Sequence, residues 1–463
     1  MDPRSLTFIA TACAGDLLKG SPEAQVLGIS TDSRRVQPGE LFFALAGEKF
    51  NGHDFLEEAA RKASALVLER SRVPARLPEC GVIAVDDTSK ALGRLAIHYR
   101  NDFALPVIAV AGSNGKTTTK ELIASVLKEK ISTLWSEASF NNHIGVPLTL
   151  LRLERIHQTA VLEAGTNHPG ELEPLVRMIQ PTYGVITSIG REHLEFFGNL
   201  QGVAREEGWL AELLPPAGRL FINGDSEWTL AIARRCPALV VRVGLAEDND
   251  WRVRSLRPDK HGSTFKVEGP LAHLCGEYRI NLLGRHQAVN ALFAICLGAE
   301  WGLSRAEIQR GLEACKAAKM RMQLFELNGV RVLDDAYNAN ADSMLAALQT
   351  LQELPCKGRK LAVLGDMGEL GVHSEAAHEE VGRHAAELGV GQLFAVGKMA
   401  PVMARGARNA GLNRVMEFPD VAAAALAVKQ FIRDGDLLLL KASRATCLEQ
   451  VAEQLRSGGA RKN

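Results

Sequence analysis

The chain has 463 residues, of which 46% are hydrophobic and 23% are charged. At about 150 residues per domain this length predicts roughly three domains, and the composition excludes a mainly disordered chain. Lys and Arg together number 54, and Asp and Glu also number 54, so the formal net charge is zero. A general electrostatic attraction for nucleic acid or an anionic membrane is therefore not expected, although a local basic pocket is compatible with this balance.

Hydropathy and cysteine usage indicate the compartment. No apolar run approaches the ~20 residues of a membrane span. The first twenty residues hold only a short, Thr-broken apolar stretch between Asp2 and Asp16, so we interpret them as folded structure and not as a signal peptide. The eight cysteines are irregularly spaced without a CxxC pair, which favours buried reduced thiols over disulfides or a zinc site. A cytoplasmic protein is therefore predicted.

Residues 1–104 predict a small N-terminal α/β domain. Apolar runs at Leu66–Leu68 and Val82–Val85 are typical of short buried strands. The amphipathic patterns Phe55–Ala63 and Ala91–Arg100 favour helices. The domain is expected to end where a proline-led buried strand begins.

Residues 105–316 predict a larger central α/β domain. Buried strand candidates alternate with helical patterns, which implies a mostly parallel sheet with right-handed crossovers. From about Trp251 to Leu283 the pattern is typical of hairpins, so an antiparallel extension is expected. A helix over Gln287–Leu297 would close this domain. The buried strand candidates are Val107–Ala111, Thr159–Leu162 and Val185–Ile189.

Residues 317–463 predict a second, smaller α/β domain. The fold class predicted for the whole chain is therefore α/β with three domains. We expect the terminal residues Ser457–Asn463 to fray. The strand candidates are Leu361–Leu364, Leu393–Val396 and Leu437–Leu440, and the helix candidates are Ser374–Leu388 and Val421–Ile432.

The strongest chemical signal is a glycine-rich loop between a buried strand and a helix. Backbone N–H groups of such a loop, backed by the helix N-terminus, cradle phosphate oxygens. Lys116 would neutralise the β- and γ-phosphates, and the Thr117 hydroxyl would bind Mg²⁺. The common GxxxxGK[ST] form has glycine where this chain has Val110, and the alternative is a tight turn with an exposed lysine. The loop residues are Ala111, Gly112, Ser113, Asn114, Gly115, Lys116, Thr117 and Thr118.

Two metal-ligand candidates follow other strands of the same predicted sheet. Glu163 comes directly after the apolar run Ala160–Leu162, where a parallel sheet places ligands, and a carboxylate there can hold Mg²⁺. His193 stands beside Glu192 after another strand, which makes a metal role competitive. The alternatives are a solvated strand-end glutamate and a structural histidine.

Together with further motifs, these residues resemble the Mur ligase family, ATP-dependent amide-forming enzymes of peptidoglycan precursor synthesis. The resemblance covers nearly the whole chain, and the order and spacing of the motifs are far more specific than any one of them. The motifs are Ser30–Arg34, Pro38–Leu45, Asn51–Phe55, the Gly112–Thr117 loop, Asn141–Pro147, Glu163, Glu192–Glu195, Gly284–His286, Asn290, Asp334–Asn340, Leu364–Gly371 and Lys441–Arg444.

Within the family, the Asp334–Asn340 and Leu364–Gly371 runs resemble the members that add a dipeptide. The resemblance implies that ATP and D-alanyl-D-alanine convert UDP-N-acetylmuramoyl-tripeptide into the pentapeptide, ADP and phosphate through an acyl phosphate. It implies two Mg²⁺ ions, a monomer, no nucleic-acid partner and a bacterial cytoplasmic location. The third peptide residue, meso-diaminopimelate or lysine, and the general base stay open.

The resemblance also assigns roles by motif position. It implies a UDP-substrate domain, a phosphate-loop ATPase domain and a Rossmann-like domain for the dipeptide, with Lys116, Glu163 and His193 catalytic. Alone, most of the other positions would fit surface or turn roles. The adenosine contacts would be Asn290, Arg321 and Asp335. The UDP-substrate contacts would be Thr31, Asp32, Ser33, Arg34, Asn141 and Asn142. The peptide side would be lined by Asn338, Asn340, Lys441, Ser443 and Arg444.

One departure from the family pattern is chemical. The family usually has a lysine whose carbamate helps to bind the second Mg²⁺, but Glu207 stands at that position, and the sequence has no lysine between Lys130 and Lys260. A glutamate keeps the charge but is shorter by about three bonds, on the order of 4 Å. We therefore expect Glu207 to be catalytic and to bind the metal directly or through a water, without a carbamylated lysine. The alternative is a solvated helix residue.

Three rival functions are weighed. Another amino-acid-adding Mur ligase, or an enzyme similar to folylpolyglutamate synthase, is disfavoured by the Thr31–Arg34 and Asp335–Asn340 runs. A non-catalytic, nucleotide-binding descendant of such a ligase is supported only by the glutamate at position 207. A phosphate-loop kinase or GTPase would need base-reading and switch motifs that we do not find.

Overall fold

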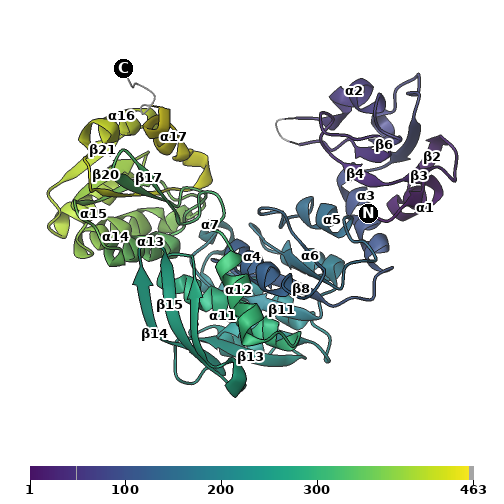
Figure 1. Cartoon of the computed structure of the whole chain (residues 1–463). Helices are drawn as coiled ribbons and strands as arrows, with labels where there is room; N and C mark the ends of the chain where they lie inside the picture. Colours follow the sequence, from purple (N-terminus) through teal and green to yellow (C-terminus); the bar gives the residue numbers. More distant parts are fainter. Residues whose placement is uncertain (48–49, 458–463) are drawn as a thin grey trace.

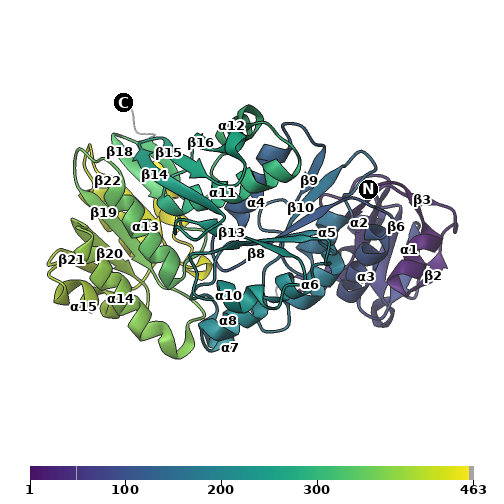
Figure 2. The same ribbon diagram turned by 90° about the horizontal axis from the view of Figure 1, so that it is seen from below.

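The computed structural model describes residues 1–47 and 50–457, and it contains three α/β bodies (Figure 1). The N-terminal body, in purple, and the C-terminal body, in yellow, form two arms above the central body. Figure 2 shows the central body between the two arms. The predicted three-domain α/β class is confirmed. Of the tail predicted to fray, Ser457 ends the last helix and the rest lies outside the described residues.

The N-terminal arm is built on a five-stranded sheet with the order β2-β7-β6-β5-β4. The neighbours from β4 to β7 are parallel, and β2 pairs with β7 antiparallel. The strands are β2 (Asp16–Lys19), β4 (Gly28–Ser30), β5 (Glu40–Phe43), β6 (Ala65–Glu69) and β7 (Gly81–Val85), and β1 (Arg4–Ser5) with β3 (Gln25–Val26) forms a separate ribbon. The helices are α1 (Leu6–Cys13), α2 (Leu56–Ala60) and α3 (Thr88–Arg100).

Helix α3 joins this arm to the central body. It packs against α5 (Gly145–Leu150) and α6 (Leu172–Ile179), and one apolar core continues from the N-terminal sheet through α3 to the central sheet. Tyr99 is fully buried at this junction, where its hydroxyl donates to Leu153 O at 2.5 Å and accepts from Asp2 N at 2.8 Å. The junction therefore combines apolar packing with hydrogen bonds between distant parts of the chain.

Replacing Tyr99 with Phe is expected to destabilise this junction by about 1–3 kcal/mol, because a carbonyl and an N–H lose their partner away from water. Differential scanning calorimetry should show a lower midpoint for the Tyr99→Phe variant. The matched control is Tyr183→Phe, since the Tyr183 hydroxyl makes no hydrogen bond among the described residues, and it should stay within about 0.5 kcal/mol of wild type. Equal midpoints for both variants would contradict the prediction.

The central body is built on a nine-stranded sheet with the order β16-β15-β14-β13-β12-β11-β8-β10-β9. Neighbours from β9 to β14 are parallel, whereas β14, β15 and β16 are antiparallel, so the predicted antiparallel extension is confirmed. The strands are β8 (Val107–Ala111), β9 (Thr133–Trp135), β10 (Thr159–Glu163), β11 (Tyr183–Ile186), β12 (Arg219–Asn223), β13 (Leu239–Gly244), β14 (Trp251–Asp259), β15 (Gly262–Glu268) and β16 (Gly276–Ile280).

Helices cover both faces of this sheet. In the fully buried strand β8, Ile108 and Val110 face a core with α4, α11 and α12, whereas Val107 and Ala109 face the core that contains α5 and α6. Burial on both faces explains why β8 is a continuous apolar run. The remaining helices of this body are α4 (Lys116–Leu127), α7 (Leu194–Phe197), α8 (Leu200–Glu207), α9 (Trp209–Glu212), α10 (Thr229–Ala233), α11 (Arg285–Glu300) and α12 (Arg305–Ala314).

The C-terminal arm is a doubly wound sheet with the order β17-β18-β22-β19-β20-β21, in which only β17 pairs antiparallel. One core packs α13, α14 and α15 on the sheet, and a second packs α16 and α17 on its other face. The strands are β17 (Gln323–Leu327), β18 (Val330–Asp334), β19 (Lys360–Gly365), β20 (Gln392–Val396), β21 (Val415–Phe418) and β22 (Leu437–Lys441). The helices are α13 (Ala341–Glu353), α14 (Ser374–Glu387), α15 (Ala400–Asn409), α16 (Val421–Phe431) and α17 (Glu449–Ser457).

Some sequence predictions differ from the structure in detail. The strand predicted over Val185–Ile189 ends at Ile186, because the next two residues turn toward the glycine-rich loop: Thr187 Oγ1 donates to Asn114 O at 2.6 Å, and Ser188 Oγ accepts from Asn114 N at 2.9 Å. The helix predicted over Phe55–Ala63 ends at Ala60.

The cysteines and helices also bear on the predicted compartment. All eight cysteines are free thiols. The prediction that they are buried is correct for Cys13, Cys296 and Cys315 and wrong for the other five, which are partly exposed. Among the described residues, no helix is both long and apolar enough to span a membrane.

Candidate active site

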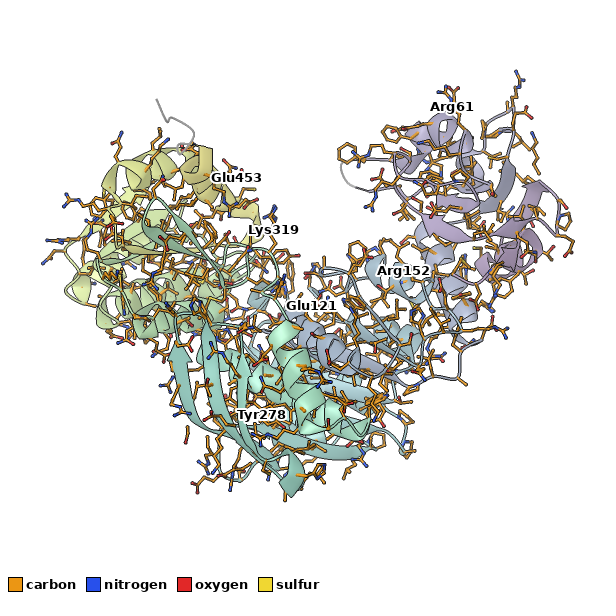
Figure 3. The ribbon with its side chains drawn as sticks, in the orientation of Figure 1. Arg61, Glu121, Arg152, Tyr278, Lys319 and Glu453 are labelled. Carbon is orange, nitrogen blue, oxygen red and sulfur yellow. The ribbon has the colours of Figure 1, made fainter. Side chains whose placement is uncertain are left out.

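The carboxyl ends of the central and C-terminal sheets meet at one cavity of ≈ 1380 Å³. Parallel α/β sheets bind ligands beyond the carboxyl ends of their strands, so this is the expected place for a site. Figure 3 shows the side chains of all three bodies. The predicted site residues that line the cavity are Ser113, Asn114, Gly115, Lys116, Thr117, Thr118, Asn141, Asn142, Glu163, His193, Asn290, Arg321, Asp335, Asn338, Asn340, Lys441, Ser443 and Arg444.

The glycine-rich loop has the backbone geometry of a phosphate cradle. Gly112 and Gly115 have φ values of 111° and 86°, which side chains rarely adopt. A Cβ atom at Gly112 would lie 2.5 Å from Thr187 Oγ1, and one at Gly115 would lie 2.8 Å from Asn290 Oδ1. Helix α4 begins directly after Gly115, so its N-terminal N–H groups point at the cavity. Both glycines are therefore required by conformation and by space.

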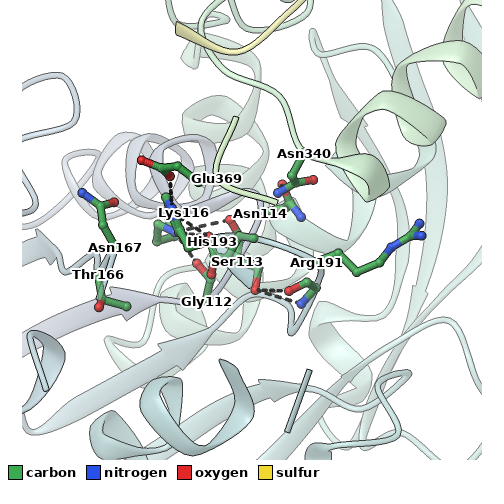
Figure 4. Close-up of polar contacts among 12 residues, drawn as sticks. Gly112, Ser113, Asn114, Lys116, Thr166, Asn167, Arg191, His193, Asn340 and Glu369 are labelled. Carbon is green, nitrogen blue, oxygen red and sulfur yellow. Dashed lines mark hydrogen bonds and ion pairs between the residues drawn. The ribbon is translucent and has the colours of Figure 1, made fainter. Parts of the chain in front are cut away.

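Lys116 lies among three buried carboxylates. Its Nζ donates to the carbonyl oxygens of Gly112 and Ser113 and lies 3.4 Å from Glu192 Oε2 (Figure 4). Burial alone would lower the pKa of Lys116, but the charges of Glu192, Glu207 and Glu163 raise it above its ordinary value. The ammonium group therefore stays charged inside the protein, ready to meet an anion.

Glu207, at the end of α8, lies behind the loop and not on the cavity wall. The side chain is fully buried, and its Oε2 accepts a hydrogen bond from Gly112 N at 2.6 Å. Burial raises the pKa of Glu207 to about 8, the Glu192 charge adds to this shift, and Lys116 and the Gly112 N–H oppose it. A solvated helix residue, the alternative weighed from sequence, is therefore excluded.

Three carboxylate oxygens in this cluster lack a hydrogen-bond partner among the described residues: Glu163 Oε2, Glu192 Oε1 and Glu207 Oε1. Buried acceptors without partners are rare, and hard cations such as Mg²⁺ prefer oxygen ligands, so the donor set fits a divalent cation. In the described part of the chain, however, no three His, Cys, Asp or Glu side chains converge on one metal position. Phosphate oxygens and waters would have to complete the coordination shell of the ion, which is usual for Mg²⁺.

The C-terminal arm contacts the central body directly at this cluster. Asn340 Nδ2 donates to Asn114 Oδ1 at 3.0 Å (Figure 4). Arg191 bonds Asp342 with both its backbone N and its Nε at 2.7 Å. Arg191 also forms an ion pair with Glu380. The glycine-rich loop is thus tied to α13 of the C-terminal arm, with Asn340 as the N-cap of that helix.

The predicted adenosine and peptide residues lie next to one another. Lys441 Nζ, which is almost fully buried, donates to Asp335 Oδ2 at 2.5 Å and to Asn338 O at 3.0 Å. Arg321 reaches across to the central body, where it bonds Ser139 Oγ at 3.3 Å, and it stacks over the Tyr337 ring. The basic pocket expected here is therefore partly neutralised, because Lys441 is already paired with a carboxylate.

The residues predicted for the UDP substrate do not come together. Asn141 lies inside the cavity, where its Nδ2 donates to Glu163 Oε1 at 2.8 Å. The run Thr31–Arg34 lies in the N-terminal arm and does not line this cavity. There Asp32 is paired with Arg34, and Ser33 Oγ donates to Glu58 Oε2 at 2.9 Å.

Sequence reasoning assigned no role to several residues that the structure places in the site. Glu192 pairs with Lys116, Glu369 pairs with His193, and Ser139 approaches both Thr117 and Arg321. Glu192 and Glu369 belong to sequence motifs that were recognised, and this membership could have indicated a role for both residues. Ser139 carried no signal of its own.

Comparison with known proteins gives matches along nearly the whole chain. Three family models match: "Mur ligase family, catalytic domain" over residues 25–100, "Mur ligase middle domain" over 110–298 and "Mur ligase, glutamate ligase domain" over 320–444. A relative from Bacillus subtilis, named UDP-N-acetylmuramoyl-tripeptide--D-alanyl-D-alanine ligase, is 36% identical and covers 98% of this chain and 99% of its own length. The chain belongs to the Mur ligase family.

Other Mur ligases support this assignment. The Escherichia coli relative with the same name is 34% identical, covering 96% of this chain and 97% of its own length. A solved structure titled MurF from Acinetobacter baumannii has a TM-score of 0.88 at 30% identity and covers 98% of this chain and 99% of its own. The matches to Mur ligases thus extend over all three bodies, including the N-terminal arm, whose described residues do not line the cavity.

Proposed function

We propose that this chain is an ATP-dependent ligase that joins D-alanyl-D-alanine to UDP-N-acetylmuramoyl-tripeptide in peptidoglycan precursor synthesis. The observation that carries this is one cavity in which a phosphate loop and a buried lysine face residues of a second domain. Relatives that bear this name match the chain over nearly its whole length.

The reaction needs a carboxylate to become a good acceptor for an amine. The terminal carboxylate of the tripeptide attacks the γ-phosphorus of ATP, ADP leaves, and an acyl phosphate forms. The dipeptide amine then attacks the acyl carbon, inorganic phosphate leaves, and the amine loses a proton. Two anions must first approach each other, and the charged Lys116 reduces their repulsion.

We assign the nucleotide phosphates to the loop Ala111–Thr118 and to the N-terminus of α4. Lys116 would leave the carbonyls of its own loop and the Glu192 carboxylate to meet the β- and γ-phosphates. Asn290, Arg321 and Asp335 would hold the adenosine, as the motif positions imply. Asn338, Asn340, Lys441, Ser443 and Arg444 would line the peptide side.

Mg²⁺ bound with the nucleotide would supply the positive charge that stabilises the transferring phosphoryl group. Thr117, Glu163, His193 and Glu207 would hold up to two ions, together with phosphate oxygens and waters. The partnerless oxygens of Glu163 and Glu207 support this assignment. A carbamylated lysine is not part of the proposal.

We assign residues 1–104 to UDP-substrate binding, 105–316 to ATP binding and 317–463 to the dipeptide. Thr31–Arg34 would receive the uridine end, and Asn141 and Asn142 would face the same substrate closer to the phosphates. We propose a monomer, because one chain supplies both walls of the cavity. We place the reaction in the bacterial cytoplasm, where ATP is available.

Phosphate release from Mg·ATP tests the function. Release should require both UDP-N-acetylmuramoyl-tripeptide and D-alanyl-D-alanine, and mass spectrometry should find the pentapeptide. UDP-N-acetylmuramoyl-dipeptide with lysine or diaminopimelate is the matched control, and it should give no product. Product from the control alone would favour a different Mur ligase. ATP binding without release in either mixture would favour a non-catalytic descendant.

A further inference from the structure

Two residues with left-handed backbones, one from each domain, meet beside the reaction centre. His193 has a φ of 48° and Glu369 a φ of 58°, and the Glu369 carboxylate bonds His193 Nδ1 (Figure 4). We propose that Glu369 is a positioning residue: when the C-terminal domain docks, its carboxylate fixes the His193 imidazole so that Nε2 faces the reaction centre. This inference rests on the proposed function, in which His193 is a site residue.

The backbone conformation of both residues supports a specific role. Non-glycine residues in this region cost free energy, on the order of 1 kcal/mol each, and persist only where surrounding contacts hold them. His193 is the N-cap of α7, and Glu369 lies in the loop after β19. Two such residues in direct contact across a domain boundary are more readily explained by function than by folding.

The docking contacts around this pair come from one short segment of the C-terminal domain. Glu195 N donates to Glu369 O at 3.0 Å, and His373 Nε2 lies 3.0 Å from Gly198 O. A Cβ atom at Gly371 would lie 3.2 Å from Glu195 Cα, so the two backbones approach closely. Residues 369–373 therefore dock on α7, and Glu369 reaches His193 only while they do.

The hydrogen bond decides which nitrogen of the neutral ring carries the proton. An ionised carboxylate only accepts hydrogen bonds, so His193 Nδ1 must donate to Glu369 and Nε2 keeps its lone pair. His193 Nε2 lies 4.0 Å from Glu192 Oε2, which is itself 3.4 Å from Lys116 Nζ. Two acceptors that face each other at this distance suit a cation that binds both. Histidine ligands are commonly fixed in this way by a carboxylate on their other nitrogen.

The test compares Glu369→Ala with His373→Ala, which removes another side-chain contact from the same docking segment. Mn²⁺ binding to the full-length protein, with ADP present, is measured by electron paramagnetic resonance. Loss of a carboxylate partner of a metal-binding histidine weakens metal binding about 10–100-fold, so Glu369→Ala should raise the Mn²⁺ Kd about tenfold. His373→Ala should leave the Mn²⁺ Kd within about twofold of wild type, because it touches no site residue.

Kinetics give a second readout. Glu369→Ala should raise the Mg²⁺ concentration needed for half-maximal pentapeptide formation and leave the KM for UDP-N-acetylmuramoyl-tripeptide unchanged, whereas Glu369→Asp should recover part of the loss. If Glu369→Ala and His373→Ala weaken Mn²⁺ binding equally, Glu369 contributes only to the docking of the C-terminal domain, and the inference is wrong. Wild-type protein that binds Mn²⁺ and ADP but forms no pentapeptide would instead overturn the proposed function.

Discussion

Replacing Lys116 with Met is expected to lower kcat for pentapeptide formation by about 10³-fold, because the site loses the cation that meets the transferring phosphoryl group. The same change should destabilise the protein. Glu163, Glu192 and Glu207 would be left buried around an uncharged side chain. Removing one partner from a buried group of charges typically costs about 3–5 kcal/mol.

Steady-state phosphate release and calorimetry check these two effects separately. Lys128→Met is the matched control, since Lys128 caps the far end of the same helix and contacts Trp135, not the cavity. It should keep kcat within about twofold of wild type. A Lys116→Met protein that retains a tenth of the wild-type rate would contradict the proposed role of the lysine.

Pentapeptide formation by the wild-type protein should not depend on dissolved CO₂, because in the proposed site the Glu207 side chain takes the place of a carbamylated lysine. Glu207→Ala should lower kcat about 10²-fold, through loss of the side chain that holds Gly112 N behind the glycine-rich loop. Glu207→Lys is the informative counterpart. If position 207 corresponds to the family's carbamylated lysine, this variant should be inactive without bicarbonate and should gain activity when bicarbonate is added.

Rates are measured in CO₂-stripped buffer and again after adding bicarbonate. A wild-type rate that falls on stripping and recovers on addition would show that Glu207 does not replace a carbamate. Stability gives an independent readout in metal-free buffer. The folded state holds the Glu207 proton up to a pH of about 8, whereas the unfolded chain releases it near the ordinary value of 4.5. Stability should therefore fall as pH rises through that window, and Glu207→Gln should remove this part of the fall.

The candidate site residues whose positions the sequence predicted are those adjacent to a strand end. The loop from Gly112 to Thr117 and the carboxylate of Glu163 follow buried strands directly, and parallel sheets bring their carboxyl ends together. Local pattern and fold rules were enough to place these residues at the carboxyl ends of the strands. The same reasoning placed three α/β sheets in the correct order along the chain.

Other features depend on packing that no local pattern reports. The pairing of Glu369 with His193 needs two domains to dock, and the two residues are 176 positions apart in the chain. Glu207 was recognised as a substitution, but its burial against Gly112 N follows from how α8 packs behind the loop. The separation of Thr31–Arg34 from the cavity depends on the position of the N-terminal arm relative to the central body, which sequence motifs do not determine.

The amide pair between Asn114 and Asn340 has a consequence for turnover. Because the glycine-rich loop is bonded to the N-cap of α13, the same contact joins the proposed nucleotide side and the proposed peptide side of the cavity. We expect spent nucleotide to exchange only after this contact opens, and such opening steps often set the pace of an enzyme. A compound that bridged Asn114 and Asn340 would then hold this contact closed and slow the release of ADP.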